Sequence, residues 1–299
     1  MSTFAFLGAI EIGLVFALVA LGVFLSFRIL NFPDLTVDGS FPLGAAVTAT
    51  LIVSGVNPWL ATAIAMVAGA CAGLVTAFLN VRFNILHLLA SILTMIALYS
   101  INLRIMGRPN VALLQQETVL TPFYNLGLTQ AEVKPIFLAV LLVIVVLLLW
   151  RFLVSDFGLA MRATGANPRM ARAQGIATSG QIYTGMALSN ALVALAGAMF
   201  AQTNGFADVT SGVGTIVVGL AAVILGETLF RSRAMLIILT ACVIGSILYR
   251  VALALALNTP ALGLEASDLQ LVTAVLVIVA LILPGVRNPL KSLIRGGKS

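Results

Sequence analysis

Side chains that could carry out chemistry are few in this sequence, and they do not form a catalytic set. His87 is the single histidine, and no Ser/His/Asp or Cys/His constellation can be assembled with any specificity. A metal site at His87 would need further ligands, which the sequence does not supply nearby. A GxxxxGK[ST] phosphate loop is absent, so the chain does not bind ATP by that route. We therefore expect no enzymatic activity, no catalytic residue, no metal and no cofactor.

Ionisable residues inside the apolar runs are scarce. Glu11 lies in the first run and Arg104 near the end of the fourth, and each is close enough to a membrane surface to snorkel. A proton-coupled carrier would be expected to hold a carboxylate or histidine relay near the middle of the membrane. No such relay is obvious here, which argues against a secondary transporter and predicts that the driving energy comes from elsewhere.

Uncharged polar residues do lie in the middle of the apolar runs. They could hydrogen-bond a solute along a translocation path, or they could bond neighbouring helices, which is the commoner use of such residues. The sequence leaves both readings open. The candidates for a path are Thr94, Asn102, Asn190 and Thr215.

The longest polar interruption covers residues 155–179 and is rich in Arg, Ala and Gly. Such a segment does not cross lipid. We expect a short helix from Phe157 to Thr164 capped by Asp156, and a second helix from Pro168 to Ala173 that ends at Gly175. A Gly-Ala-Asn-Pro corner joins the two. The segment could lie on the membrane surface, but its bulky apolar residues are sparse and its small residues favour close approach by a partner.

The composition indicates an all-α polytopic membrane protein. The 299 residues are 61% hydrophobic and only 9% charged, whereas about 25% charged residues are typical of soluble domains. The 26 glycines suit close helix packing in lipid. A formal charge of +6 could suggest a nucleic-acid binder. The charges are scattered between apolar runs, however, so we expect contact with membrane lipid and none with nucleic acid.

Nine apolar runs are candidate membrane spans, because about 20 residues cross a bilayer as helix. Two of them are short and interrupted by Gly or Pro, which is typical of broken helices that line a pathway. Ordinary tilted helices are the alternative. We therefore predict a helical bundle of about 8–10 spans. The runs are 5–27, 41–54, 58–80, 85–107, 135–154, 180–203, 211–229, 234–256 and 268–286.

The Lys and Arg residues predict the orientation, because cytoplasmic loops carry an excess of them. A cytoplasmic C-terminus places 12 of the 16 basic residues inside. With nine spans the N-terminus then lies outside, and the external segment 108–134 fits a small lid or docking surface. The remaining basic residues fall outside and are Arg104, Arg108, Lys134 and Arg250.

A weak internal repeat relates two parts of the chain. Phe32–Thr36 matches Phe206–Thr210, and each copy follows a long apolar run and precedes a short one. Five spans separate the copies, so Asp34 is expected on the inside and Asp208 on the outside, as an inverted repeat would require. Alternatively, both copies are simply helix N-caps.

The polar interruption resembles the cytoplasmic coupling loop of the permease family that serves branched-chain amino acid and ribose-type ABC importers. Segments 37–40 and 217–226 are similar to the family's early and later broken segments, although Gly226-Glu227 departs from the usual consecutive glycines. Segment 92–104 looks like a branch linked to aromatic amino acid uptake. The coupling residues that carry the resemblance are Gly158, Arg162, Ala163, Gly165, Asn167, Pro168, Ala171, Gly175 and Ile176.

The resemblance implies a permease subunit of an ATP-driven importer, with one transmembrane domain over residues 1–299. It implies three partners: a cytoplasmic ABC ATPase subunit, a periplasmic or lipid-anchored solute-binding protein, and a second permease copy in a homodimer. The expected solute is small, with an amino acid preferred, and the expected location is the bacterial inner (plasma) membrane. The alternative is an ATP-independent carrier or channel with inverted repeats.

Overall fold

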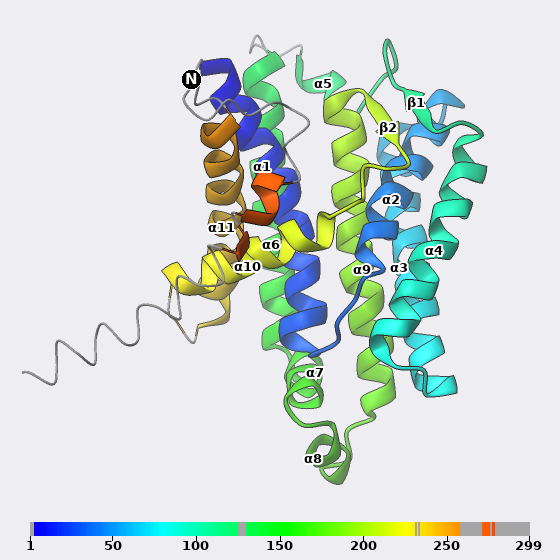
Figure 1. Cartoon of the computed structure of the whole chain (residues 1–299), viewed down its shortest axis with the longest axis vertical. Helices are drawn as coiled ribbons and strands as arrows, with labels where there is room; N and C mark the ends of the chain where they lie inside the picture. The colour runs from blue at the N-terminus through cyan, green and yellow to red at the C-terminus, as the bar shows by residue number, and fades with distance from the viewer. Residues whose placement is uncertain are drawn as a thin grey trace, which may run out of the picture.

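The computed structural model is a helical bundle with one two-stranded sheet (Figure 1). The residues that it describes are 3–124, 130–230, 232, 234–257, 271–275 and 277–278. The helices within them are α1 (Thr3–Val23), continued by the π-helix η1 (Phe24–Ile29), α2 (Val37–Val53), α3 (Pro58–Phe83), α4 (His87–Met106), α5 (Thr121–Tyr124), α6 (Gln130–Val154), α7 (Asp156–Ala166), α8 (Pro168–Ala173), α9 (Thr178–Asn204), α10 (Thr215–Leu229) and α11 (Met235–Leu257); the strands are β1 (Asn110–Ala112) and β2 (Phe206–Asp208).

The predicted spans are confirmed as far as the structure describes them. Six helices are long and apolar enough to cross a membrane, and α2 and α10 are the two shorter apolar helices that the Gly and Pro residues predicted. The ninth predicted span, 268–286, lies largely outside the described residues. The chain is thus a multi-pass helical membrane protein.

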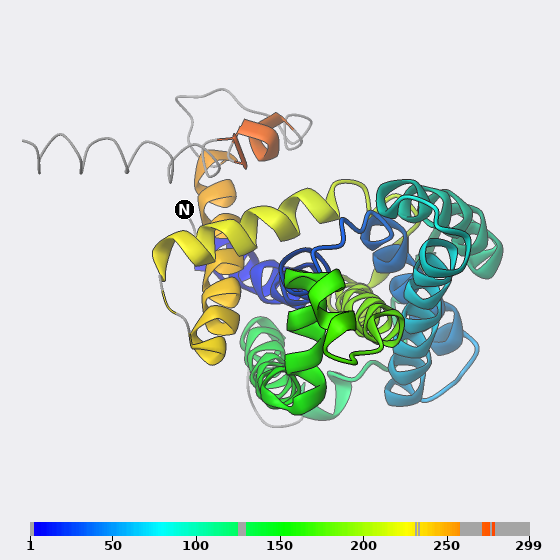
Figure 2. The same cartoon turned by 90° about the horizontal axis from the view of Figure 1, so that it is seen from below.

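The centre of the bundle is formed by α1 and α9, which the other long helices surround (Figure 2). Their side chains are the most buried among the long helices because both are packed on several sides, whereas α3, α4 and α6 leave many apolar side chains exposed, as lipid-facing helices do. Leu18 and Leu21 of α1 and Val193 of α9 belong to one buried apolar cluster.

The two short helices begin inside the bundle rather than at its ends. Ser40, in the first turn of α2, hydrogen-bonds Asn190 in the middle of α9. The other short helix, α10, lies across α1 and α11 instead of along them (Figure 1). The sequence left broken and ordinary tilted helices open, and the structure favours the broken type.

The internal repeat extends well beyond its matching pentapeptides. α1 packs against α10 and α11, and the equivalent helix α9 packs against α2 and α3 in the opposite direction. The residue shift that aligns Phe32 with Phe206 also aligns two contacts. A side chain on Gly219 would meet Val23, and one on Gly197 would meet the backbone nitrogen of Ala45. Under this shift Ala45 corresponds to Gly219, and Val23 corresponds to Gly197. The two contacts are therefore the same contact in the two halves, and the fold contains an inverted repeat.

The segment predicted to be a lid is tied down by strand pairing. β1 runs antiparallel to β2, with Val111 opposite Ala207, and the Val119 amide donates to the Gln202 side chain at 2.9 Å. Partial burial alone would raise the pKa of Asp208 in β2. Hydrogen bonds from Thr210 and Asn110 outweigh that effect and hold the pKa below its usual value. We call this pairing the β1–β2 strap.

Candidate functional site

The two short helices of the polar interruption project beyond one end of the bundle (Figure 1). The Asn167 side chain accepts hydrogen bonds from the backbone amides of Arg169 and Met170, both at 3.1 Å, and so caps α8, which starts at Pro168 as predicted. Gly175 ends this turn with a φ of 82°, in the left-handed region that glycine adopts readily. We call α7 and α8 together the α7–α8 corner.

Two details of the α7–α8 corner differ from the sequence prediction. The N-cap of α7 is Ser155, whose hydroxyl accepts from the Gly158 amide at 3.4 Å, so the assignment of Asp156 as cap was wrong. Ser155 has the extended backbone that a cap requires, whereas Asp156 already lies in the first turn. The helix also continues to Ala166, which places Gly165 inside α7 rather than in the break.

One face of the α7–α8 corner is packed against the bundle through small residues. Gly158 lies so close to the end of α6 that a side chain would overlap the Phe152 carbonyl oxygen. A side chain on Gly165 would overlap the carbonyl oxygen of Ile29, the last residue of η1. Met161, fully buried, lies near Gly185 of α9. The corner therefore touches the central helices directly.

The opposite face of the corner is exposed and partly apolar. Phe157, Leu159 and Met170 are exposed, and Met170 is 61% accessible. The residues predicted to bind a partner divide between the two faces. Gly158, Gly165 and Ala171 are buried, Arg162 and Ile176 are half-buried, and Ala163, Asn167, Pro168 and Gly175 are exposed. The arrangement suits a segment held by the bundle on one side and free to contact a second protein on the other.

A second cluster forms inside the bundle where α2 and α10 meet. Asp38, in the first turn of α2, accepts hydrogen bonds from the backbone amides of Gly214 (3.2 Å) and Ile216 (2.8 Å). Its carboxylate therefore caps the N-terminus of α10, where free N–H groups and the helix dipole favour negative charge. We call this contact the α2–α10 junction.

The linker before α2 carries another carboxylate, and this one is fully buried. Asp34 is completely buried, and its oxygens accept from the Thr36 amide (2.9 Å) and the Asn190 side chain (2.8 Å). Asn190 accepts in turn from the Ser40 hydroxyl at 2.7 Å. Asn190 and Thr36 thus supply the hydrogen bonds that water would otherwise give to Asp34. The expected position of Asp34 on the inner side of the membrane stays a prediction. Asp208 makes the same local bond, to the Thr210 amide at 2.7 Å.

Three of the four predicted path residues lie at or beside the α2–α10 junction, and Thr215 stands between the two residues whose amides Asp38 caps. Asn190 contacts Asp34 and Ser40, and the Asn102 amide donates to the Gly39 carbonyl at 3.2 Å. The hydroxyls of Thr94 and Thr215 each donate to a backbone carbonyl four residues earlier in the sequence. All four are buried, and whether any of them contacts a solute stays a prediction. Asp38 was not among the predicted site residues, although a carboxylate at the start of a short apolar segment was a usable signal.

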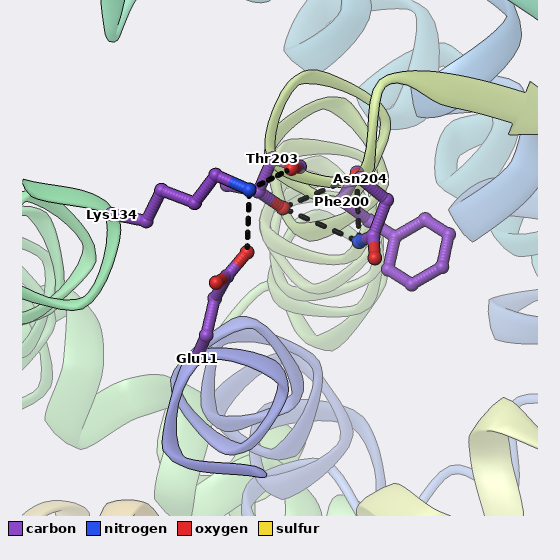
Figure 3. Close-up of polar contacts among 5 residues, drawn as sticks. All are labelled: Glu11, Lys134, Phe200, Thr203 and Asn204. Atoms are coloured by element: carbon purple, nitrogen blue, oxygen red, sulfur yellow. Dashed lines mark hydrogen bonds and ion pairs between the residues drawn. The ribbon is translucent and has the colours of Figure 1, made fainter. Parts of the chain in front are cut away.

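Glu11 joins three helices at the end opposite the α7–α8 corner. Its carboxylate lies 3.7 Å from the Lys134 ammonium of α6, and Lys134 also donates to the Thr203 carbonyl in the last turn of α9 at 2.7 Å (Figure 3). A cation there complements the negative end of the α9 dipole. Snorkelling, which the sequence allowed for Glu11, is thus replaced by an interhelical contact.

The orientation count had placed Arg250 outside the membrane, and the structure places it inside the bundle instead. It belongs to α11, and its guanidinium lies 3.8 Å from the ring centroid of Phe16 in the middle of α1. The aromatic face stabilises the cation. Among the residues that the structure describes, no group of three His, Cys, Asp or Glu is placed to hold a metal ion.

Comparisons with known proteins place this geometry in context. Residues 6–283 match the model of a family described as the branched-chain amino acid transport system / permease component. A tyrosine transport system permease protein of Clostridioides difficile (strain R20291) is 38% identical over 266 residues, which is 89% of this chain and 86% of that protein. An uncharacterised protein of Rickettsia prowazekii (strain Madrid E) is 35% identical, over 91% of this chain and 95% of that protein.

Two further similarities are more distant. The "Probable branched-chain amino acid transport permease protein LivH" of Methanocaldococcus jannaschii is 30% identical over 64% of each chain. The solved structure "PsaBC from Streptococcus pneumoniae in complex with Fab" superimposes with a TM-score of 0.50 at 15% identity, over 94% of this chain and 91% of that one. At that identity the likeness concerns the fold alone.

Proposed function

The chain belongs to the branched-chain amino acid transport permease family, and we propose that its α7–α8 corner is the coupling loop through which a separate ATPase drives transport. The chain is then a single permease domain over residues 1–299, with residues 155–179 as the part that meets the ATPase. It performs no chemistry itself and forms the path that the solute follows across the membrane.

The observation that carries this proposal is the contact between Gly165 and Ile29. One face of α7 rests directly on the backbone at the end of η1, and the other face is open to a partner. A push on the open face is therefore passed to the central helix without an intervening flexible side chain. Coupling requires that the docked corner make different contacts in the two states of the cycle.

Orientation and partners follow from the same proposal. The α7–α8 corner and the C-terminus lie in the cytoplasm, where the ATPase binds, and the protein is embedded in the bacterial inner membrane. The β1–β2 strap then lies on the outside, where a solute-binding protein delivers its cargo. A second permease copy completes a homodimeric transport unit.

The proposed solute is an aromatic amino acid of the tyrosine type. The supporting observations are the name of the C. difficile relative, which is identical to this chain at 38% of 266 aligned residues, and the resemblance of segment 92–104 to that branch. Uptake of labelled tyrosine should be competed by phenylalanine and tryptophan more strongly than by leucine. Stronger competition by leucine would instead indicate a branched-chain substrate.

Co-purification and uptake test the coupling role together. The permease, expressed with the ATPase and binding protein encoded beside it, should retain the ATPase through purification. Gly165→Trp and Arg162→Glu should abolish ATP-dependent uptake, whereas Arg82→Glu, at an exposed position near the end of α3, should not. Retention of full uptake by both corner variants would contradict the proposal.

An ATP-independent carrier remains the alternative. The buried carboxylate of Asp34 and the half-buried carboxylate of Asp38 give it some support, because carriers often use such groups. Proteoliposomes that contain the permease alone separate the two functions. Accumulation of solute in response to a proton or sodium gradient, without ATPase, would favour the carrier. We expect accumulation only with the ATPase and ATP present.

A further inference from the structure

The helix α10 is held at both ends by one short stretch of chain. Near its end, the Arg28 Nε lies 2.6 Å from a carboxylate oxygen of Glu227. At its start, the Asp38 carboxylate accepts from Gly214 and Ile216. A 15-residue helix is about 22 Å long, so residues 28–38 span most of the length of α10. We call residues 28–38 the strut.

The strut is fixed along its length rather than free to flex. Leu30 packs against Gly185 of α9. Phe32 is almost fully buried, and the centroid of its ring lies 4.2 Å from the centroid of the His87 ring. Asp34 is bonded to Asn190. A segment with buried side chains and satisfied polar groups moves as a unit, so a displacement at one end reaches the other.

The strut also receives the contact from α7. Ile29, whose carbonyl Gly165 touches, follows Arg28 directly in the chain. The strut begins in a π-helical turn, in which the Leu30 amide donates to the Leu25 carbonyl at 3.1 Å. Such turns occur mostly at functional sites, because their irregular hydrogen bonding can rearrange.

The charge on Glu227 is not explained by helix stability. It lies in the last turn of α10, where a negative charge opposes the helix dipole and costs roughly 0.3–1 kcal/mol. Its pairing with Arg28 is partly exposed, with side-chain accessibilities of 63% for Arg28 and 26% for Glu227. Exposed ion pairs contribute about 0–1 kcal/mol, so the pair does little for folding.

From these contacts we infer that the strut carries the movement of α7 to both ends of α10, and that Arg28 and Glu227 are a positioning pair that makes ATP hydrolysis productive for transport. The inference rests on the proposed function and adds its transmission route. When α7 pushes on Ile29, Arg28 pulls the end of α10 while Asp38 carries its start. Without the pair, α10 follows at one end only, and hydrolysis proceeds with less solute moved.

A charge-swap experiment in the reconstituted transporter, with ATPase and binding protein present, tests the pair. The variants are Arg28→Glu, Glu227→Arg and the double swap, with Arg82→Glu as the matched control at the same end of the bundle. The readout is labelled solute taken up per ATP hydrolysed. Each single reversal should lower this ratio about five- to tenfold, within the usual range of coupling energies, and the double swap should restore most of it.

Purely structural damage would give a different pattern. Thermal melting and ATPase co-purification should be nearly unchanged in the single variants, because the exposed pair contributes little to stability. Should a reversal nevertheless prevent assembly, Arg28→Gln and Glu227→Gln replace it, and the same loss of ratio is expected. An unchanged ratio in the single variants, or a well-assembled double swap that restores nothing, overturns the inference.

The same measurement distinguishes this inference from the proposed function. If the unmodified permease retains no ATPase, or accumulates solute without ATP, the coupling role itself is wrong. If the unmodified transporter is ATP-dependent but the charge variants take up as much solute per ATP as it does, the coupling role stands and the proposed route through the strut is wrong.

Discussion

Gly165 is the residue at which the proposed input from the ATPase reaches the bundle, and the contact leaves no room for a side chain. Gly165→Ala should force α7 away from Ile29 and cost about 1–3 kcal/mol, as overpacking does. Gly180→Ala is the matched control, because a side chain there would meet open space. Thermal melting in detergent and ATP-dependent uptake should both fall for the first variant only; equal behaviour of the two would contradict the close contact.

Asn190 is the residue on which the buried polar cluster depends, since it bonds both Asp34 and Ser40. Asn190→Leu should destabilise the protein by about 1.5–3 kcal/mol, because a buried carboxylate loses a donor. Adding Asp34→Asn should recover part of the loss by removing the charge. Thr94→Val, which removes only a bond to the Ala90 carbonyl in the same helix, should be milder. Unfolding in denaturant gives the free energy of unfolding of the wild type, the Asn190→Leu variant, the double variant and the Thr94→Val variant. A loss in Thr94→Val as large as that in Asn190→Leu would contradict the central role of Asn190.

The capping residues at the two ends of α8 could be predicted from the sequence. The Asn-Pro pair predicted the start of α8 and Gly175 its end, because capping depends on neighbouring residues. Contacts between distant residues were not readable. Asp38 and Ile216 are 178 positions apart, and no spacing rule connects them. Only the folded arrangement shows that the Asp38 carboxylate caps a helix other than its own.

At the scale of the elements, the first turn of α10 depends on a group that α2 supplies. Asp38→Ala should free the amides of Gly214 and Ile216 and weaken the first turn of α10 by about 0.5–2 kcal/mol, the usual worth of an N-cap. Asp38→Asn keeps an acceptor and should have a smaller effect. Hydrogen exchange of a peptide covering residues 214–218 should accelerate in the order wild type, Asn, Ala. Unchanged exchange in the Ala variant would mean that the cap does not hold this turn.

Element positions were predicted better than element contacts. Apolar runs of about 20 residues placed the long helices, because the bilayer sets their length. The irregular parts escaped prediction. Hydrophobicity does not distinguish the π-helical turn η1 from an α-helix, and β1 finds its partner only because β2 lies beside it in the folded chain. Both irregular parts flank the broken helices, where function is expected to concentrate.

On the scale of the whole molecule, the two halves of the inverted repeat have the same helices but different linkers. The linker that contains Asp34 is packed inside the bundle, whereas the equivalent linker with Asp208 is drawn outward by the β1–β2 strap. Inverted repeats allow a transporter to reach its opposite state by exchanging the arrangements of its halves. The difference between the linkers is therefore the asymmetry that such a cycle would reverse.

Thr36 and Thr210 are equivalent positions that report this exchange. Thr36 is fully buried and Thr210 is exposed. In a background with Cys71→Ser, single Thr36→Cys and Thr210→Cys variants can be labelled with a membrane-impermeant maleimide in the assembled transporter. Without nucleotide, position 210 should react and position 36 should not. Trapping the ATPase with a non-hydrolysable ATP analogue should protect position 210 and expose position 36 from the cytoplasmic side, because the halves exchange arrangements. Cys242, which is fully buried, provides the unreactive control. Labelling that the analogue leaves unchanged at both positions would mean that the linkers stay fixed and that the spans move around them as rigid bodies.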